Sequence, residues 1–243
     1  MNPSPMSESL APKPPPRGID LPFDDGEPLE SSRHFEQMAL LIHTLRHAWR
    51  DRHDFYVAGN MFLYFSETQS RRNDFRGPDV FVVLDTDDHA RRSWVVWEED
   101  GKLPAVVIEL TSESTEAVDR GKKKTIYGRT LRIPFYVVYD PFSARLDAFG
   151  LDFETLEYQP VAPDARGYVR CGPLGLWLGV VPSRHQGNDA PWLRWIDDAG
   201  EIVRSAEERA EAESARAASE SARAQAAEAE LERLRGELAR RGP

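Results

Sequence analysis

Two carboxylates occupy unusual places in this sequence. Glu109 is the only polar residue in the run 105–110, and Asp79 follows Pro78 and opens the apolar run 80–84. Strands that are apolar on both faces are usually covered on both sides. A carboxylate there is costly unless it is paired, protonated or bound to a cation. Because hard divalent cations prefer carboxylate oxygens, Asp79 and Glu109 are predicted metal ligands.

Each acid also has an ordinary explanation, and a nearby lysine helps to decide between the two. An aspartate between a proline and a strand is common turn chemistry, and a glutamate at a strand end can reach solvent. In the run Lys122-Lys123-Lys124, only Lys123 lies four residues before Tyr127, which is expected on the packed face of a helix. We therefore expect Lys123 to point toward the strand ends.

Two acids and one lysine are the groups that hydrolysis of a phosphodiester bond requires. A bound divalent ion polarises the phosphoryl oxygen and lowers the pKa of a bound water. A lysine can orient that water or stabilise charge on the phosphorus. The predicted catalytic residues are therefore Asp79, Glu109 and Lys123, with Mg²⁺ as the cofactor and Mn²⁺ as its alternative.

The elements around these residues indicate an α/β (α+β) domain with a mixed sheet. A serine cap at Ser31 begins a helix to Trp49, and its expected apolar face is Phe35, Met38, Leu41, Ile42 and Leu45. Strands are expected at 55–58, 61–65, 79–84, 94–97, 105–110 and 134–140, and short strands continue to residue 202. A helix over 119–131, with its cap at Ser114 or Thr115, makes the region 104–140 a crossover between two strands.

Composition divides the chain into three parts. Residues 1–29 are rich in proline and are expected to be a disordered arm, and residues 30–203 are expected to form the nuclease domain. Residues 204–243 form an Ala/Glu/Arg-rich helical tail. One seven-residue repeat in this tail consists of Val203, Ala210, Ala217, Ala224, Leu231 and Leu238. This repeat would form the first seam of a coiled coil. The residues three positions further on would form the second seam, which holds Glu213 and Glu220 before Ala227 and Leu234. A solvated single helix and a coiled coil that makes a homodimer therefore both stay open.

Charge and composition limit the functions that are open to the chain. The net charge is −10, which excludes binding to nucleic acid through a basic field of the whole molecule. Contacts to DNA would come from local basic residues, and the candidates are Arg71, Arg72, Arg76, Lys122 and Lys124. No apolar run is long enough to span a membrane, and no export signal is evident. With one cysteine, Cys171, the sequence is typical of a cytoplasmic protein.

Several motifs together resemble the Uma-two family of restriction-type endonucleases, which is part of the PD-(D/E)XK nuclease superfamily. The motifs are Gly77-Pro78-Asp79-Val80, the run 106–112, Ser114-Thr115, Asp119, Lys123, Tyr127 and the run 133–141. The resemblance implies a restriction-endonuclease-like core with flanking helices, and it makes Asp79 and Glu109 the metal-binding acids of a magnesium-dependent DNA endonuclease.

The sequence departs from this pattern at two places. The superfamily lysine two residues after the second acid is replaced by Thr111, and by resemblance Lys123 substitutes for it. Glu113 adds a carboxylate to a segment that is usually Ser-Pro-Ser. Glu36 matches a frequent extra metal-binding acid of the superfamily, although it can equally be an exposed helix residue. Two rival functions stay open: a catalytically silent module that binds nucleic acid or protein, and an oligomerisation protein that acts through its tail.

Overall fold

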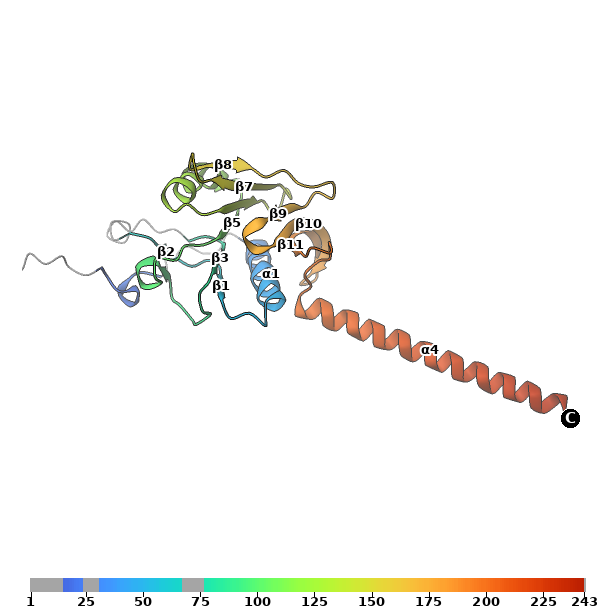
Figure 1. Cartoon of the computed structure of the whole chain (residues 1–243). Coiled ribbons are helices and arrows are strands. Elements are labelled where there is room, and N and C mark those ends of the chain that lie inside the picture. Colours follow the sequence, from blue (N-terminus) through green and yellow to red (C-terminus); the bar gives the residue numbers. More distant parts are fainter. Residues whose placement is uncertain (1–14, 24–30, 67–76, 243) are drawn as a thin grey trace, which may run out of the picture.

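The structure is a computed structural model that describes residues 15–23, 31–66 and 77–242. Its central sheet has six strands in the order β1-β3-β5-β6-β7-β8 (Figure 1). β5 and β6 are parallel and the other neighbours are antiparallel, which confirms the predicted mixed sheet. The strands are β1 (Phe55–Ala58), β3 (Val80–Leu84), β5 (Val106–Leu110), β6 (Phe135–Tyr139), β7 (Leu146–Asp152) and β8 (Glu157–Pro160).

A helical crossover joins the parallel strands β5 and β6, as the sequence predicts. It begins with α3 (Glu116–Val118) and continues through two π-helical segments, η3 (Asp119–Lys123) and η4 (Ile126–Thr130). The helix begins directly after Thr115, one of the two expected cap positions, but neither expected residue caps it with a side chain. The Thr115 hydroxyl instead accepts a hydrogen bond from the backbone N–H of Ser112, so it stabilises the preceding turn.

One face of the sheet is covered by α1 (Ser32–Ala48) and by a second, three-stranded sheet. The Ser31 side chain caps α1 as predicted, because it accepts from the N–H of His34. The expected apolar face is wrong at Phe35, which is 53% exposed, whereas Leu40 is buried. The second sheet and the turn within it are β9 (Val169–Cys171), η5 (Gly172–Leu174), β10 (Leu176–His185) and β11 (Asn188–Ile196).

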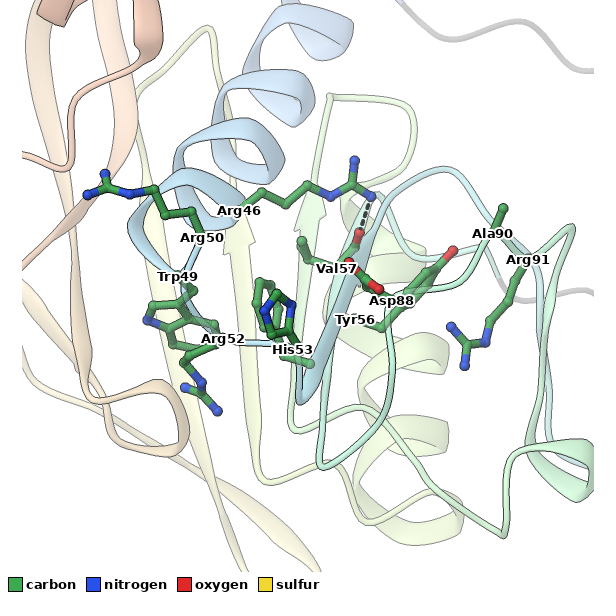
Figure 2. Close-up of a pocket in the computed structure, with 11 residues that line it drawn as sticks. Arg46, Trp49, Arg50, Arg52, His53, Tyr56, Val57, Asp88, Ala90 and Arg91 are labelled. Carbon is green, nitrogen blue, oxygen red and sulfur yellow. Dashed lines mark hydrogen bonds between the residues drawn. The ribbon is translucent and has the colours of Figure 1, made fainter.

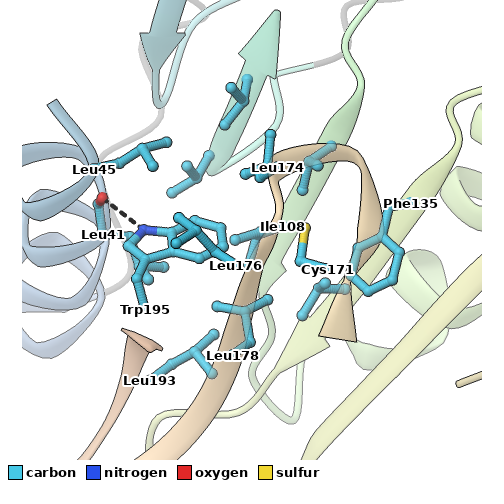
Figure 3. Packing of buried hydrophobic residues seen from close by; sticks show 14 of the residues in the cluster. Leu41, Leu45, Ile108, Phe135, Cys171, Leu174, Leu176, Leu178, Leu193 and Trp195 are labelled. Atoms are coloured by element: carbon cyan, nitrogen blue, oxygen red, sulfur yellow. Dashed lines mark hydrogen bonds between the residues drawn. The ribbon is translucent and has the colours of Figure 1, made fainter. Parts of the chain in front are cut away.

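The side chains between these layers form the main core. The indole N–H of Trp195 donates to the carbonyl oxygen of Leu41 at 2.9 Å, which ties β11 to α1 (Figure 3). Ile108 from the central sheet and Cys171 from β9 meet in the same cluster. This core fixes the position of β5, which carries Glu109.

The opposite face of the central sheet is covered by the crossover helix and by two short parallel strands, β2 (Leu63–Tyr64) and β4 (Trp94–Val95). Both strands are shorter than expected. β4 ends at Val95 because η2 (Val96–Glu98) begins directly after it. Tyr127 of the crossover helix is fully buried against this face. Glu109 points to the same side, since side chains alternate along a strand and Val107 belongs to this cluster.

Residues 15–23 were expected to belong to a disordered arm, but they pack against the domain. They include η1 (Gly18–Asp20), and Leu21 is buried. The backbone N–H of Gly18 donates to Glu98, and Trp97 and Tyr64 donate to backbone oxygens of Pro16 and Pro22. These side-chain partners lie far away in the sequence, so composition alone could not indicate them. The rest of the expected arm, residues 1–14 and 24–29, lies outside the described residues.

The tail is one helix, α4 (Ala206–Arg241), which projects away from the body (Figure 1). Ser205 and Glu208 form a capping box at its first turn. Arg194 of β11 is 1% exposed and donates to both oxygens of Glu208 at 2.8 and 2.7 Å. This ion pair fixes the start of the helix to the body.

Candidate active site

Asp79, directly before β3, and Glu109 of β5 lie opposite each other at the edge of two adjacent strands. β3 and β5 are antiparallel with Val80 opposite Ile108, and the same register places residue 79 opposite residue 109. The backbone N–H of Asp79 donates to Glu109 Oε2 at 3.4 Å, and the N–H of Leu110 donates to Asp79 Oδ2 at 2.7 Å. The strand pairing therefore brings together the two acids that the sequence singled out.

Lys123 lies above this pair on the crossover helix. Its Nζ is 3.0 Å from Glu109 Oε2 and 2.9 Å from Asp119 Oδ1. Glu109 is 0% exposed and Asp119 is 1% exposed, whereas the Lys123 side chain keeps 23% of its surface in solvent. The direction expected for Lys123 from its spacing to Tyr127 agrees with the structure.

Two tyrosines complete the buried network. The hydroxyl of Tyr127 donates to Glu109 Oε1 at 2.8 Å, so both oxygens of this carboxylate have partners. The hydroxyl of Tyr136 on β6 donates to the backbone oxygen of Asp119 at 2.9 Å. The first bond holds η4 against the sheet and the second holds η3, so together they position Lys123 beside the acids.

Burial and charge shift the titration of the site in opposite directions. Burial raises the pKa of the Glu109 carboxyl well above its usual range, although the nearby Lys123 ammonium opposes this shift. Burial also raises the pKa of Asp79. For Lys123, burial lowers the pKa, but the Glu109 and Asp119 carboxylates outweigh it and leave the pKa above its ordinary value. The lysine is therefore charged at neutral pH.

The sequence did not single out Asp119, Tyr127 or Tyr136 as members of the site. For Asp119 a signal was present, because it lies four residues before Lys123 and can pair with it on one helix face. Tyr127 was expected only on the packed face of the helix, and no local signal indicated that either tyrosine hydroxyl reaches the site. Their hydroxyls reach Glu109 and the Asp119 backbone only because β5, β6 and the crossover helix pack together.

The remaining predicted residues lie elsewhere. The carboxylate of Glu36 accepts from the Asn188 side chain of β11, so the structure does not bring it to Asp79 and Glu109. Lys122 is exposed, as expected, but Lys124 lies over the ring of Phe149 at 3.3 Å and is only partly solvated. Arg71, Arg72 and Arg76 lie outside the described residues.

The carboxylates of the site suit a hard divalent cation that takes few of its ligands from the protein. Asp79, Glu109 and Asp119 supply three carboxylates against the single ammonium of Lys123. Within the part of the chain that the structure describes, no group of three or more His, Cys, Asp or Glu side chains is arranged to hold a metal ion. Mg²⁺ is commonly held by one or two carboxylates and keeps several waters, so the pair Asp79 and Glu109 fits this ion.

A separate pocket of about 580 Å³ lies near the start of β1 (Figure 2). The two acids lie near the opposite end of β1, because Ala58 at that end pairs with Phe81 near the start of β3. Arg46, Arg50, Arg52 and Arg91 line it together with aromatic side chains. Arg46 donates to the backbone oxygen of Val57, and the others have carboxylate partners outside the lining. The charge of this pocket is thus largely balanced, and it is not continuous with the acidic pair.

The mixed sheet, the crossover helix and the two opposed acids define a protein with a restriction-endonuclease-like core. The sequence model of the Uma2 family, described as "Putative restriction endonuclease", matches residues 8–180. This is well over half of the chain, and the chain therefore belongs to the Uma2 family. No curated protein matches it. Among the helices that the structure describes, none is both long and apolar enough to cross a membrane.

Proposed function

We propose that this protein is a metal-dependent endonuclease that hydrolyses phosphodiester bonds of DNA. One observation carries the proposal: Asp79 and Glu109 lie opposite each other at the edge of two buried strands, with Lys123 within 3.0 Å of Glu109. The family membership supports a nuclease-type function. Asp79 and Glu109 would hold the divalent ion, most simply Mg²⁺, and Lys123 would assist.

Each residue has a distinct part in the proposed reaction. When bound, the ion would supply Lewis acidity toward the phosphodiester and activation of a water. Asp79 and Glu109 must both be ionised to hold it, which the neighbouring ammonium favours. Lys123 is partly exposed, so it can contact an incoming phosphate while its Asp119 partner holds it in place. Tyr127 orients the Glu109 carboxylate by donating to its second oxygen.

Binding of DNA to this acidic protein would depend on cations close to the site. Lys122 is exposed one residue from Lys123, and Arg71, Arg72 and Arg76 precede Asp79 closely in the sequence. These residues would contact phosphates locally, in contrast to the overall charge of −10. Lys124 is a weaker candidate than the sequence indicated, because it lies over Phe149.

One observation favours a second candidate, a catalytically silent nuclease fold that binds nucleic acid or protein. Lys123 already forms ion pairs with Glu109 and Asp119, so these buried acids have a cationic partner without any metal. Incubation of the purified protein with plasmid, single-stranded DNA and RNA, with and without Mg²⁺ or Mn²⁺, separates the two functions. Metal-dependent cleavage supports the nuclease, and binding without cleavage in any condition supports the silent module.

We also propose that the tail assembles two copies of the chain. α4 is 36 residues long, and its side chains from 210 to 235 are all exposed. Leu231 and Leu234 are 52% and 42% exposed at coiled-coil spacing. Light scattering on the purified full chain tests this proposal, since a homodimer has twice the mass of 27.6 kDa.

A further inference from the structure

The start of α4 is held rigidly, so its direction is defined by the body. Arg194, Ser205 and Glu208 form the buried ion pair and the capping box described above. The Gln186 amide also donates to both carboxylate oxygens of Glu207, at 3.2 and 3.0 Å. A second copy that meets this helix therefore meets a rod of fixed direction, about 54 Å long at 1.5 Å per residue.

The orientation of two paired tails is limited by the acids of the second seam. In a parallel pair in register, Glu213 would face Glu213 of the second copy and Glu220 would face Glu220. Like charges that face each other across a seam destabilise the pair. A parallel dimer would therefore bring two acid pairs into contact along its axis.

An antiparallel pair avoids these contacts. The first seam of one helix then faces the second seam of the other, so that Ala210 lies opposite Leu234. The same register places Glu213 opposite Leu231 and Glu220 opposite Ala224. No acid faces an acid in these layers, and small side chains lie opposite large ones at the two ends, which packs well.

Charges that flank the seam favour the same orientation. In the antiparallel register, three pairs of oppositely charged residues lie next to each other across the two copies, and each pair occurs twice by symmetry. These pairs are Arg209 with Glu237, Arg216 with Glu230, and Glu207 with Arg235. The parallel register forms two kinds, Arg223 with Glu228 and Glu230 with Arg235. The antiparallel register also places Arg223 of one helix next to Arg223 of the other, which brings two like charges together. Such exposed pairs contribute little stability each, but they select partner orientation.

An apolar pocket at the base of α4 offers a place for the end of the partner helix. It has a volume of about 470 Å³, and its lining is mainly apolar, including Phe35, Ala39, Leu40 and Ala206. The 53% exposure of Phe35 was unexpected for a helix residue at an apolar position. In the antiparallel register, the C-terminal turns of the second copy's helix lie beside Ala206 and hence beside this pocket.

We infer that α4 pairs antiparallel with α4 of a second copy, and that the C-terminal end of each helix docks beside Phe35 of the other copy. This inference rests on the proposal that the tail makes a homodimer. The starts of the two helices are then about 50 Å apart, at 1.5 Å per residue. The two bodies lie at opposite ends of the rod, so the two acidic sites are not brought side by side.

Disulfide trapping with two single-cysteine substitutions tests the orientation. Ala210→Cys and Leu234→Cys are made separately in the full chain, one with an affinity tag, and are mixed before mild oxidation. The native Cys171 is fully buried and should not react. We expect crosslinked dimers that contain one copy of each variant, and little crosslinking when either variant is oxidised alone.

A matched control and two contrary outcomes complete the experiment. Ala222→Cys is also exposed on α4 but lies outside both seams, so it should not crosslink. If each seam variant crosslinks to itself, the helices are parallel and the inference is wrong although the homodimer stands. If the wild-type chain has the mass of a monomer and no mixture crosslinks, the proposed homodimer fails as well.

Discussion

Lys123 is the cation on which the buried acids of the site depend. Its Nζ contacts Glu109 and Asp119, which are 0% and 1% exposed. Removal of one partner from a buried ion pair usually costs about 3–5 kcal/mol, because the other charge stays buried without compensation. Its side chain is 23% exposed, so the low end of this range applies. We expect Lys123→Met to lower the free energy of unfolding by about 3 kcal/mol at neutral pH.

The pH dependence of this loss has a defined sign. Without Lys123, the pKa of Glu109 in the folded state rises further above its value in the unfolded chain. A carboxyl with a raised folded-state pKa contributes stability below its unfolded pKa and loses it as pH rises through the folded pKa. The loss of unfolding free energy in Lys123→Met should thus become smaller at acid pH, and it should become larger at pH values above the ordinary pKa of a glutamate. Urea unfolding at several pH values checks this, with exposed Lys122→Met as the control; a deficit independent of pH would contradict it.

Cys171 gives a second prediction at the scale of a single residue. It is fully buried in the main core, and burial raises the pKa of its thiol to about 12. Because only the thiolate is reactive, we expect no reaction with a thiol reagent in the folded protein at pH 8. One thiol per chain should react in denaturant. Rapid reaction of the native protein would show that β9 opens easily from the core.

Among the elements, the turn after β1 positions the backbone that carries Asp79. A Cβ on Gly59 would overlap the backbone oxygen of Asp79 and lie 2.8 Å from Met38 Sδ and 2.9 Å from Ile42 Cδ1. The glycine thus allows α1, β1 and the start of β3 to approach closely. We expect Gly59→Ala to destabilise the fold by about 1–3 kcal/mol, since these neighbours must move.

Gly121 on the crossover helix is a suitable comparison for Gly59. A Cβ there meets nothing within 4 Å, so Gly121→Ala should be neutral or stabilise the helix by up to about 1 kcal/mol. Thermal unfolding of both variants is the measurement. Equal effects of the two substitutions would show that the close approach at Gly59 has no importance for the packing around Asp79.

The sequence predicted these elements well where one local pattern decides the outcome. The apolar runs 105–110 and 134–140 indicated neighbouring strands, and the helix between them implied the parallel pair β5 and β6. The sequence did not predict the structure where contacts with residues distant in the sequence determine it. Phe35 follows the helical period but is exposed, and residues 15–23 are ordered by bonds to Tyr64, Trp97 and Glu98. The tyrosines of the site belong to this second group.

At the scale of the whole molecule, body and tail are joined by an ion pair that crosses the predicted boundary at residue 203. Arg194 is 1% exposed, and Glu208 is its carboxylate partner. A chain cut after Ile202 loses Glu208 and leaves a buried guanidinium without its partner, at a cost of about 3–5 kcal/mol. A chain cut after Ala212 keeps the ion pair, so we expect it to be almost as stable as the full body.

Chemical denaturation of the two shortened chains measures this difference, and Glu208→Gln in the longer one tests its cause. The substitution should move the stability of the longer chain toward that of the shorter one. If both chains unfold at the same denaturant concentration, the ion pair does not fix the tail to the body. Both shortened chains lack α4 beyond Ala212 and with it both leucines Leu231 and Leu234, so both should be monomers by light scattering if the tail makes the dimer.

The most direct test of the proposed nuclease site is calorimetric titration of Mg²⁺ and Mn²⁺ into the wild-type chain and three variants. Asp79→Asn and Glu109→Gln keep the size of each side chain and remove its charge, whereas Glu113→Gln removes an exposed carboxylate four residues after Glu109. We expect the wild type and Glu113→Gln to bind a divalent ion with similar affinity, and the other two variants to lose that binding while circular dichroism stays unchanged. Absence of binding in the wild type, or equal affinity in all four proteins, would contradict a metal site at Asp79 and Glu109.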